Sequence, residues 1–576
     1  MKNPEIAKVL YDVADILEIQ GVQFKPNAYR KAARGVESLS REISDIYEEE
    51  GPKGLRKIPG VGESIAEKIE EMVKTGNLKY CDELKKAIPK NLSELIEIPG
   101  MGPKRAKLLH EKLRISSVED LKTAIKRQKI RKLRGFGEKS ETDLLKGIEL
   151  LKKGHERMLL GNALPMARLV ESRLKELKEA YKVSIAGSLR RRNETIGDVD
   201  ILVAAGKPRV IMNFFTTMPD VERVIAKGPT KSAVLLSNGI QADLRVVEDN
   251  SFGAALQYFT GNKEHNIKLR GMASKKGLKI SEYGVFNKKT GKRIAGRSEN
   301  EVYGELGLPY IEPELRENQG EIEAALEGKL PKIINYNDIK GDLHVHTRHS
   351  DGANTIEEMA LAAQGMGYEY ICIADHTKSQ RIARGQTEEQ VLKEIEEIRA
   401  LNKRMRIRIL AGAEVDIKAN GELDLDDSVL KKLDIASISV HSRFKSSREE
   451  MTERILKAME NEHVDILNHP TGRLISRRAP YEVDLQRIFK KAAERNIFLE
   501  VNSFPDRLDL KDVHVKAAIE AGAHLVISTD SHNKEHLRYI EYGIATARRG
   551  WAEKKDVINT RPLKVLPKYF RKIRKG

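Results

Sequence analysis

Histidine is concentrated in one segment of this chain, because eleven of its fourteen histidines lie between His344 and His536. In the same segment, short apolar stretches alternate with amphipathic stretches of helical length, which is typical of a parallel β/α barrel. Nine imidazoles and carboxylates follow the apolar stretches: His344, His346, Asp351, His376, Glu414, His441, His469, Asp530 and His532. We expect them to meet at the carboxyl ends of the strands, where such barrels display their active sites. These ligand types favour a cluster of Zn²⁺, Mn²⁺ or Fe²⁺ that generates a bound hydroxide.

The length of the chain predicts several domains. Its 576 residues exceed the practical size of one hydrophobic core, and domains of about 100–200 residues are usual. Two cysteines, Cys81 and Cys372, are too few and too far apart for a disulfide framework or a thiolate zinc site. No apolar run approaches the ~20 residues of a membrane span, and no signal-peptide pattern is present. We therefore predict a cytoplasmic protein that does not contact a membrane.

The net charge of +17 is unevenly distributed along the chain. Residues 101–300 contain 42 Lys and Arg against 22 Asp and Glu, whereas residues 301–550 contain 36 against 44. The basic part is suited to a polyanion such as nucleic acid, and the acidic part concentrates carboxylates that could surround metal.

Residues 1–150 have the pattern of helices separated by short glycine turns. The segments 55–73, 92–113 and 129–148 each place G-x-G between an apolar helix and an amphipathic one. Such turns direct backbone N–H groups outward at the start of a helix, where phosphate binds. The three copies resemble helix-hairpin-helix modules, which hold the nucleic acid backbone without reading its sequence. The glycines expected to contact DNA are Gly60, Gly62, Gly100, Gly102, Gly135 and Gly137.

After residue 181 the pattern changes to short strands, and one of them carries two aspartates. In "DVDILV", Asp198 and Asp200 project from one face of the strand, and Asp243 has the same alternation in "QADLRVV". Three carboxylates on one sheet repel one another, and divalent cations between them make the arrangement favourable. Two ions such as Mg²⁺ or Mn²⁺ held in this way can activate a hydroxyl and clamp a triphosphate for in-line attack.

The segment "AGSLRRRNETIG" precedes these aspartates and supplies further groups for nucleotidyl transfer. Gly187 permits close backbone approach, and Ser188 offers a hydroxyl. Arg190 or Arg191 can neutralise the leaving pyrophosphate.

G-S, arginines and D-x-D, followed by "YFTGNKEHNIKLR" at 258–270, resemble the family X DNA polymerases, whose best-known member is DNA polymerase beta. This resemblance implies that Tyr258 and Phe259 pack against the incoming sugar and exclude a ribose hydroxyl. It further implies that Asn266 touches the nucleotide and that Arg270 contacts the template side. Gly261 belongs to the same nucleotide-binding motif.

The histidine-rich segment is similar to PHP (polymerase and histidinol phosphatase) domains, which are distorted (β/α)7 barrels that hold three metal ions. The resemblance implies three ligand sets, with Glu414 shared by the first two. The sets are His344, His346, Glu414 and Asp530; Glu414, His441 and His469; and Asp351, His376 and His532. His349 and Asp375 lie nearby in the sequence.

The resemblances together predict a multidomain α+β and α/β chain. The expected parts are a lyase-like helix-hairpin-helix domain (1–85), fingers with helix-hairpin-helix motifs (86–150), a palm (151–250), a thumb (251–312), a linker (313–336) and a PHP barrel (337–576).

Lys68 falls where the small domain of DNA polymerase beta has its Schiff-base lysine. The resemblance implies a 5'-deoxyribose phosphate lyase activity, with Lys25 and Lys57 binding the 5' phosphate and lowering the pKa of the amine. The alternative is an ordinary solvated lysine on an amphipathic helix between Glu67 and Glu70.

The resulting hypothesis is a monomeric repair polymerase that fills short gaps during base excision repair and carries an end-processing nuclease. Its substrates would be gapped or nicked DNA and deoxynucleoside triphosphates. The PHP part would act as a 3'–5' exonuclease, with AP endonuclease or 3'-phosphatase activity as further options. Two alternatives stay open at this point: a PHP domain that hydrolyses a small phosphate ester independently of DNA, and a DNA-binding scaffold whose two catalytic centres are vestigial.

Overall fold

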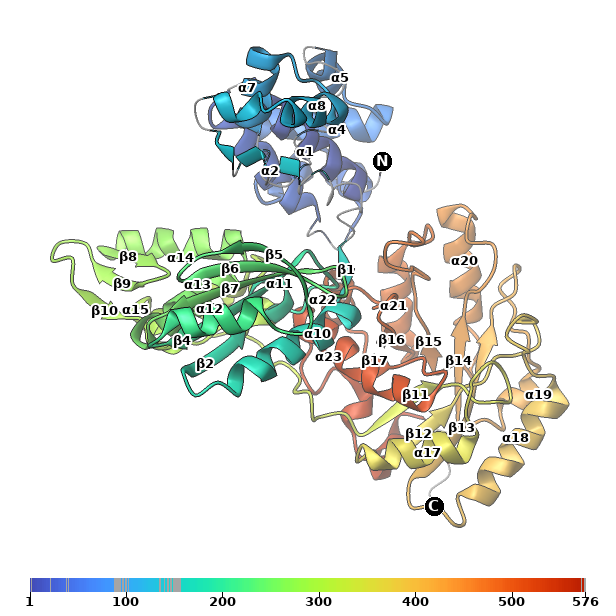
Figure 1. Ribbon diagram of the computed structural model, residues 1–576. Coiled ribbons are helices and arrows are strands. Elements are labelled where there is room, and N and C mark those ends of the chain that lie inside the picture. The colour runs from blue at the N-terminus through green and yellow to red at the C-terminus, as the bar shows by residue number, and fades with distance from the viewer. Residues whose placement is uncertain are drawn as a thin grey trace. The chain divides into compact units, whose positions relative to one another are not determined.

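A computed structural model of the chain forms two compact units, residues 1–156 and 157–576 (Figure 1). The structure describes residues 1, 3–20, 22–37, 39, 41–86, 95, 98, 101, 103–133, 136–138, 140–141, 144–145, 148, 157–570 and 572–573. Within these ranges, none of the helices is long and apolar enough to cross a membrane.

The described part of the first unit consists of helices around two apolar cores. α1 (Asn3–Ile19), α2 (Lys25–Glu37), α3 (Ile43–Lys57), α4 (Glu63–Thr75) and α5 (Lys79–Lys86) enclose the first core. α7 (Pro103–Leu113) and α8 (Val118–Lys126) contribute to the second core. The turn between α3 and α4 contains Gly60 with a φ of 86°, where a side chain would press on the backbone of Lys31 and Ala32. The predicted helix-hairpin-helix architecture is confirmed here.

The palm is a mixed sheet in the order β2-β4-β7-β6-β5. Its strands are β2 (Ala180–Ile185), β4 (Asp198–Ala205), β5 (Val221–Lys227), β6 (Lys231–Leu236) and β7 (Gln241–Val247). One face of β4 packs Val199 and Ile201 into a core shared with α10 (Leu160–Lys175) and α12 (Pro208–Thr216). On the other face, α13 (Phe252–Thr260) covers Leu202 and Ala204. Asp198 and Asp200 point to the same face of β4 as Leu202 and Ala204. They come before these two residues along the strand, so α13 does not cover them and they remain accessible.

The thumb continues from α13 through α14 (Lys263–Lys275) to an antiparallel sheet and α15 (Glu299–Glu305). The sheet strands are β8 (Leu278–Ser281), β9 (Gly284–Asn287) and β10 (Arg293–Ala295). The expected linker 313–336 contains η3 (Pro313–Leu315) and α16 (Glu321–Leu326). Leu315, Ile322 and Ile333 pack into the thumb core, so this segment is part of a folded body despite its polar composition.

The third part of the chain is the predicted parallel barrel, coloured yellow to red in Figure 1. In the described chain its sheet follows sequence order from β11 to β17, and every pairing is parallel. The His346 amide donates a hydrogen bond of 2.8 Å to the Ser531 carbonyl, which brings the two ends of the sheet together. The strands are β11 (Gly341–Val345), β12 (Tyr370–Ile373), β13 (Arg408–Asp416), β14 (Ile435–Ser439), β15 (Ile466–Leu467), β16 (Phe498–Asn502) and β17 (Leu525–Ser528).

Helices alternate with the barrel strands and share their core. These include α17 (Ile356–Gly365), α18 (Glu388–Leu401), α20 (Arg448–Ala458), α21 (Leu485–Arg495), α22 (Asp512–Glu520) and α23 (Ile540–Arg549). Thr355, Thr387 and Ser447 begin three of them with capping boxes, which satisfy backbone N–H groups of the first turn. Ile371 and Ile373 pack on the helix side of β12, while Tyr370 and Cys372 point to the inside of the barrel. Barrel, palm and thumb belong to one unit.

Buried charges join the barrel to the palm and thumb. Arg549, at the end of α23, donates to the Arg191 carbonyl (2.8 Å) and to Glu317 Oε1 (2.8 Å). Its Nε atom donates to Asp512 Oδ2 at 2.9 Å. Burial would raise the pKa of Glu317, but Arg191 and Arg549 lower it to about 2, so this carboxylate stays ionised. The barrel therefore holds the palm loop that leads to Asp198.

Replacing Arg549 by methionine is expected to lower the free energy of unfolding by about 3–5 kcal/mol, because Glu317 and Asp512 would be left buried beside a neutral side chain. Urea denaturation followed by circular dichroism measures the change. Arg487→Met removes exposed ion pairs with Glu449 and Glu453 and should cost no more than about 1 kcal/mol. Equal effects of the two substitutions would contradict the conclusion that Arg549 stabilises the fold as the buried partner of Glu317 and Asp512.

Candidate active sites

The palm brings its three aspartates onto adjacent strands. β4 and β7 are parallel, and their register sets Asp200 directly beside Asp243. Lys231 Nζ lies 3.1 Å from Asp243 Oδ2, and Gln241 donates to Asp243 Oδ1 at 2.7 Å. The aspartates thus share one end of one sheet face, as the D-x-D spacing predicts.

The electrostatics of this carboxylate group favour a cation. Burial, and then the charges of Asp198 and Asp243, raise the pKa of Asp200 to about 7. Burial and Asp243 also raise the pKa of Asp198. A divalent cation between the carboxylates would remove this mutual repulsion, and an all-oxygen donor set suits Mg²⁺ or Mn²⁺.

Gly187 lies directly against Asp200. Its φ is 62°, and a Cβ atom at this position would overlap the Asp200 Oδ2 atom. The Ala186 amide also donates to the Asp200 carbonyl at 2.8 Å, which fixes the loop to the strand. The glycine therefore permits the close approach that its place in the motif predicts.

Gly187→Ala is expected to lower the rate of primer extension about a hundredfold, since the methyl group would displace the Asp200 carboxylate and strain the backbone. Gly271→Ala is the matched control, because Gly271 lies in α14 with no atom near the position of a Cβ. Single-nucleotide incorporation kinetics of both variants measure the effect. Full activity of the Gly187 variant would show that Asp200 tolerates displacement.

The two arginines predicted to bind pyrophosphate have other partners in this structure. Arg190 Nη2 lies 2.6 Å from Glu299 Oε2, and Arg191 Nε lies 2.9 Å from Glu317 Oε1. Both carboxylates belong to the segment that follows the palm, so these arginines fasten the palm loop to the thumb. Ser188 is partly exposed beside them. Contact of these three residues with a nucleotide stays a prediction.

The other predicted nucleotide contacts cluster around the end of α13. The Tyr258 and Phe259 rings meet edge to face with centroids 5.2 Å apart. Asn266 donates to the Tyr258 carbonyl at 2.7 Å, so it fixes this turn. Gly261 has a φ of 70° and Arg270 is exposed. Their roles toward a nucleotide or a template also stay predictions.

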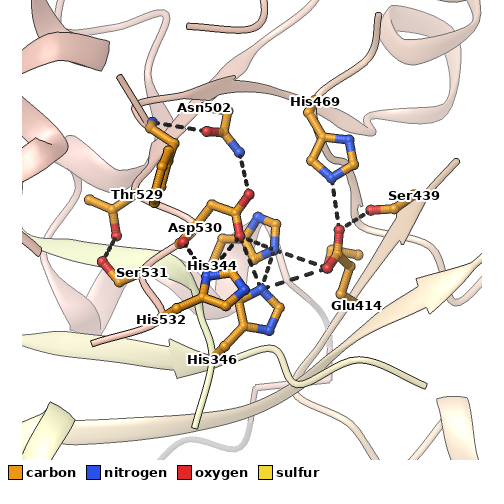
Figure 2. Close-up of polar contacts among 12 residues, drawn as sticks. His344, His346, Glu414, Ser439, His469, Asn502, Thr529, Asp530, Ser531 and His532 are labelled. Atoms are coloured by element: carbon orange, nitrogen blue, oxygen red, sulfur yellow. Dashed lines mark hydrogen bonds and ion pairs between the residues drawn. The ribbon is translucent and has the colours of Figure 1, made fainter. Parts of the chain in front are cut away.

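In the barrel, the nine predicted ligands converge at the carboxyl ends of the strands. Figure 2 shows the inner part of this cluster with His344, His346, Glu414, His469, Asp530 and His532. Glu414 is central: its carboxylate lies 2.9 Å from His376 Nδ1, 2.9 Å from His469 Nε2 and 3.4 Å from His441 Nε2. His344 and His346 face each other with their Nε2 atoms 3.1 Å apart, and Asp530 Oδ1 lies 3.1 Å from His346 Nε2.

Within the described residues, three groups bring one ligand atom from each member to within 4.8 Å of the others. They are His346, Asp351, His376 and His532; His344, His346 and Asp530; and His376, Glu414 and His441. These groups differ from the predicted sets in detail: His346 also joins the Asp351 group, and Glu414 is grouped with His376 and His441, although His469 Nε2 also lies 2.9 Å from Glu414. Which side chains share an ion stays a prediction.

The donor set fits divalent metals. The Nδ1 atoms of His346, His441 and His469 are buried and have no hydrogen-bond partner among the described residues. Burial lowers the pKa of His346 and of His469 to about 4, with further contributions from His532 and Arg507 respectively, so both rings are neutral. Neutral imidazole is the form that binds a metal ion.

The central carboxylates are ionised. Burial would raise the pKa of Glu414, but His376, His441 and His344 hold it well below its usual range. Burial would lower the pKa of His441, but Glu414 and Asp416 raise it to about 9. A cation that enters the site would replace such protons, so metal binding should release them.

The sequence analysis missed three charged side chains that contact the candidate ligands. Glu500 accepts from His344 Nδ1 at 2.7 Å, Asp416 Oδ1 lies 3.5 Å from His441 Nδ1, and Arg507 Nε lies 3.3 Å from Asp530 Oδ2. A charged residue within the apolar stretch "FLEVN" and the E-x-D alternation in "GAEVD" were available signals for the first two. Arg507 has no such signal.

Asp375 and His349 both lie near predicted ligands in the sequence, but only Asp375 lies next to the cluster in the structure. Asp375 accepts hydrogen bonds from the Thr347 amide and the Ser350 hydroxyl, and its Oδ1 lies 4.0 Å from His346 Nδ1. Asp375 therefore holds in place the loop 347–350, which follows the candidate ligand His346. His349 pairs with Glu397 on the surface and contributes nothing to the cluster.

In the first unit, the Lys68 amine donates to the Ser64 hydroxyl (3.1 Å) and lies 5.0 Å from the Tyr80 ring centroid. Lys57 pairs with Glu50, and Lys25 is exposed at the start of α2. Gly62 is the N-cap of α4, and Gly137 is described, whereas the predicted DNA contacts Gly100, Gly102 and Gly135 lie outside the described residues.

The folds and sites define a nucleotidyltransferase palm joined to a metal-binding phosphoesterase barrel. Comparisons with known families match the helix-hairpin-helix domain (residues 1–78), the SAM-like helix-hairpin-helix tandem (92–149), the DNA polymerase beta palm (162–233) and thumb (255–317), and the PHP domain (342–504).

Individual relatives agree with these matches. The chain is 39% identical to the DNA polymerase/3'-5' exonuclease PolX of Bacillus subtilis, over 99% of this chain and all of that protein. It is 27% identical to DNA polymerase lambda of Rattus norvegicus, over 55% of this chain and 56% of that protein. A probable phosphatase of Thermoanaerobacter sp. (strain X514) matches 38% of the chain at 30% identity, over 89% of its own length. The chain belongs to the PolX family, that is, the family X DNA polymerases with a C-terminal PHP domain.

Proposed function

We propose that this protein extends a DNA primer at the palm aspartates and degrades DNA from its 3' end at the barrel cluster. The observation that carries the proposal is that both ligand sets are complete and converge at strand ends. Complete sets argue against a scaffold with vestigial centres. The likeness to a polymerase with 3'–5' exonuclease activity supports the same two reactions.

At the palm, the primer 3'-hydroxyl attacks the α-phosphorus of a deoxynucleoside triphosphate and pyrophosphate leaves. Two divalent ions bound by Asp198, Asp200 and Asp243 would supply charge neutralisation and activate the attacking hydroxyl. Asp200 is the residue best placed to hold such ions, because the Gly187 backbone fixes it from one side and Asp243 lies beside it. Lys231 keeps the Asp243 carboxylate oriented.

At the barrel, water attacks the phosphorus of the last phosphodiester, and the bond from that phosphorus to the 3' oxygen of the preceding nucleotide breaks. The products are a nucleoside 5'-monophosphate and a shortened DNA strand that ends in a 3'-hydroxyl. Metal ions bound by the nine ligands would supply the hydroxide. Glu500 orients His344 through its Nδ1 atom, as a carboxylate behind a metal-bound histidine does. Arg507 offers a cation beside Asp530 for the phosphate.

The ions are expected to differ between the centres. We propose Mg²⁺ or Mn²⁺ for the palm, and a cluster of three Zn²⁺, Mn²⁺ or Fe²⁺ ions for the barrel, because imidazole selects softer metals than carboxylate alone.

Exhaustive removal of transition metals followed by addition of Mg²⁺ is expected to restore primer extension while 3' degradation stays at least about a hundredfold reduced. Addition of Mn²⁺ should restore both activities. Full degradation with Mg²⁺ alone, in protein shown by elemental analysis to lack transition metals, would contradict this assignment.

A small phosphate ester is the rival substrate for the barrel. The buried ion pairs between barrel, palm and thumb favour a shared DNA substrate. The test offers the full chain a 3'-recessed duplex and histidinol phosphate, and compares kcat/KM. We expect a preference for DNA, and a preference for the small ester would overturn the proposal.

Several finer points rest on the sequence alone. Gap filling in base excision repair, AP endonuclease or 3'-phosphatase activity, lyase activity of Lys68, the predicted domain boundaries, a monomeric state and a cytoplasmic location stay predictions.

A further inference from the structure

The loop 378–385, "KSQRIARG", begins two residues after the candidate ligand His376 and exposes an isoleucine between two arginines. Ile382 is fully exposed, more than any other large apolar side chain in the described chain. Arg381 and Arg384 are exposed as well, and neither pairs with a carboxylate among the described residues. A surface isoleucine by itself is ordinary, but this one is flanked by free cations at a phosphodiester site.

The loop is held firmly at its base. The Ser379 amide donates to Asp424 Oδ2 at 2.9 Å, and Gln380 Nε2 donates to Asp416 Oδ2 at 2.9 Å. The Gly385 amide closes the loop on the Gln380 carbonyl at 2.9 Å, and a side chain at Gly385 would overlap the Thr377 carbonyl. Asp416 also lies beside the ligand His441, so the loop base is tied to the cluster. The hydrogen bonds at the base of the loop therefore fix the position of its exposed tip, residues 381–384.

The inner part of the cluster is recessed. The side chains of His344, His346, Glu414 and Asp530 are between 0% and 6% exposed, whereas those of His532 and Asp351 at the rim are 30% and 32% exposed. The end of a duplex is too wide to bring its terminal phosphodiester to such atoms, so one strand has to leave the helix first. Unpaired bases would find further partners at this end of the barrel, where Arg478 lies 4.2 Å from the Phe444 ring centroid.

We propose that this loop opens the terminal base pair of a duplex 3' end. Ile382 inserts against the last base pair, as apolar wedges do in DNA-distorting proteins, while Arg381 and Arg384 hold the flanking phosphates. The freed 3' strand then reaches the cluster. This inference rests on the proposed function of the barrel and specifies the form of its substrate.

The test measures nucleotide release by the full chain from a paired 3' end and from a single-stranded 3' end. Ile382→Ala is expected to slow release from the paired end about tenfold and to leave the single-stranded rate within about twofold. Leu361→Ala is the control, because Leu361 is 53% exposed on α17, outside the loop. Arg381→Gln with Arg384→Gln should slow both substrates and reduce the salt dependence of binding.

A second readout does not depend on hydrolysis. With a chelator present, the wild-type chain should raise the fluorescence of 2-aminopurine at a paired 3' terminus, and Ile382→Ala should not. In the Ile382→Ala variant, equal slowing of release from both ends, or no change at the paired end, would overturn the wedge. Absence of release from any DNA end by the wild-type chain would instead reject the proposed function of the barrel.

Discussion

Asp200→Asn is expected to lower the rate of primer extension at least about a thousandfold, because it removes the carboxylate placed to bind cations between Asp198 and Asp243. Release of nucleotides from 3' ends should stay within about twofold, since the barrel ligands are on other strands. Incorporation kinetics on a gapped duplex measure the first rate, and single-stranded DNA measures the second.

Stability separates this effect from misfolding. The raised pKa of Asp200 shows that its negative charge is unfavourable in the metal-free fold, so the neutral amide should not lower the thermal midpoint. Asp249→Asn is the control, because Asp249 is half-exposed and pairs with Lys182. Extension within tenfold of wild type in the Asp200 variant would reject the assignment of this carboxylate.

Glu414→Gln is expected to give the reverse pattern, with 3' degradation at least about a thousandfold slower and primer extension retained. No other carboxylate in the described cluster touches as many of the candidate ligands as Glu414, which contacts His344, His346, His376, His441 and His469. The amide keeps the shape but loses the charge that attracts the metal ions.

Two measurements accompany this variant. Elemental analysis should show fewer bound metal ions, and circular dichroism should show an intact fold. Glu397→Gln is the control, since Glu397 pairs with His349 on the surface. Undiminished degradation in the Glu414 variant would mean that the catalytic cluster lies elsewhere.

The candidate ligands whose positions were predictable from sequence share one property: local chain geometry determines where they point. Asp198 and Asp200 lie two apart on β4, so alternation alone puts both on one face. His344 lies on β11 and His346 directly follows the last residue of that strand, and their Nε2 atoms lie 3.1 Å apart. Of the other barrel candidates, Glu414 lies near the end of β13 and the rest follow strands, and a parallel barrel gathers such positions at one end.

What the sequence did not predict depends on partners distant along the chain. Arg190 and Arg191 lie beside G-S and D-x-D, and the sequence did not predict their ion pairs with Glu299 and Glu317, more than 100 residues away. Their contact with a nucleotide stays a prediction. The segment 313–336 looks like a polar linker because its apolar residues are sparse, and only the thumb core shows that they are buried. Arg507 pairs with Asp530 only because the barrel fold brings the two side chains together.

The central claim is that one chain holds two independent metal centres of opposite effect on a DNA end. The most direct measurement incubates the wild-type chain and the Asp200→Asn and Glu414→Gln variants with a labelled gapped duplex, with and without nucleotides, and resolves the products on one gel. The account predicts lengthening with nucleotides and shortening without them for the wild type, shortening alone for Asp200→Asn and lengthening alone for Glu414→Gln. Loss of both activities in either correctly folded variant would contradict it.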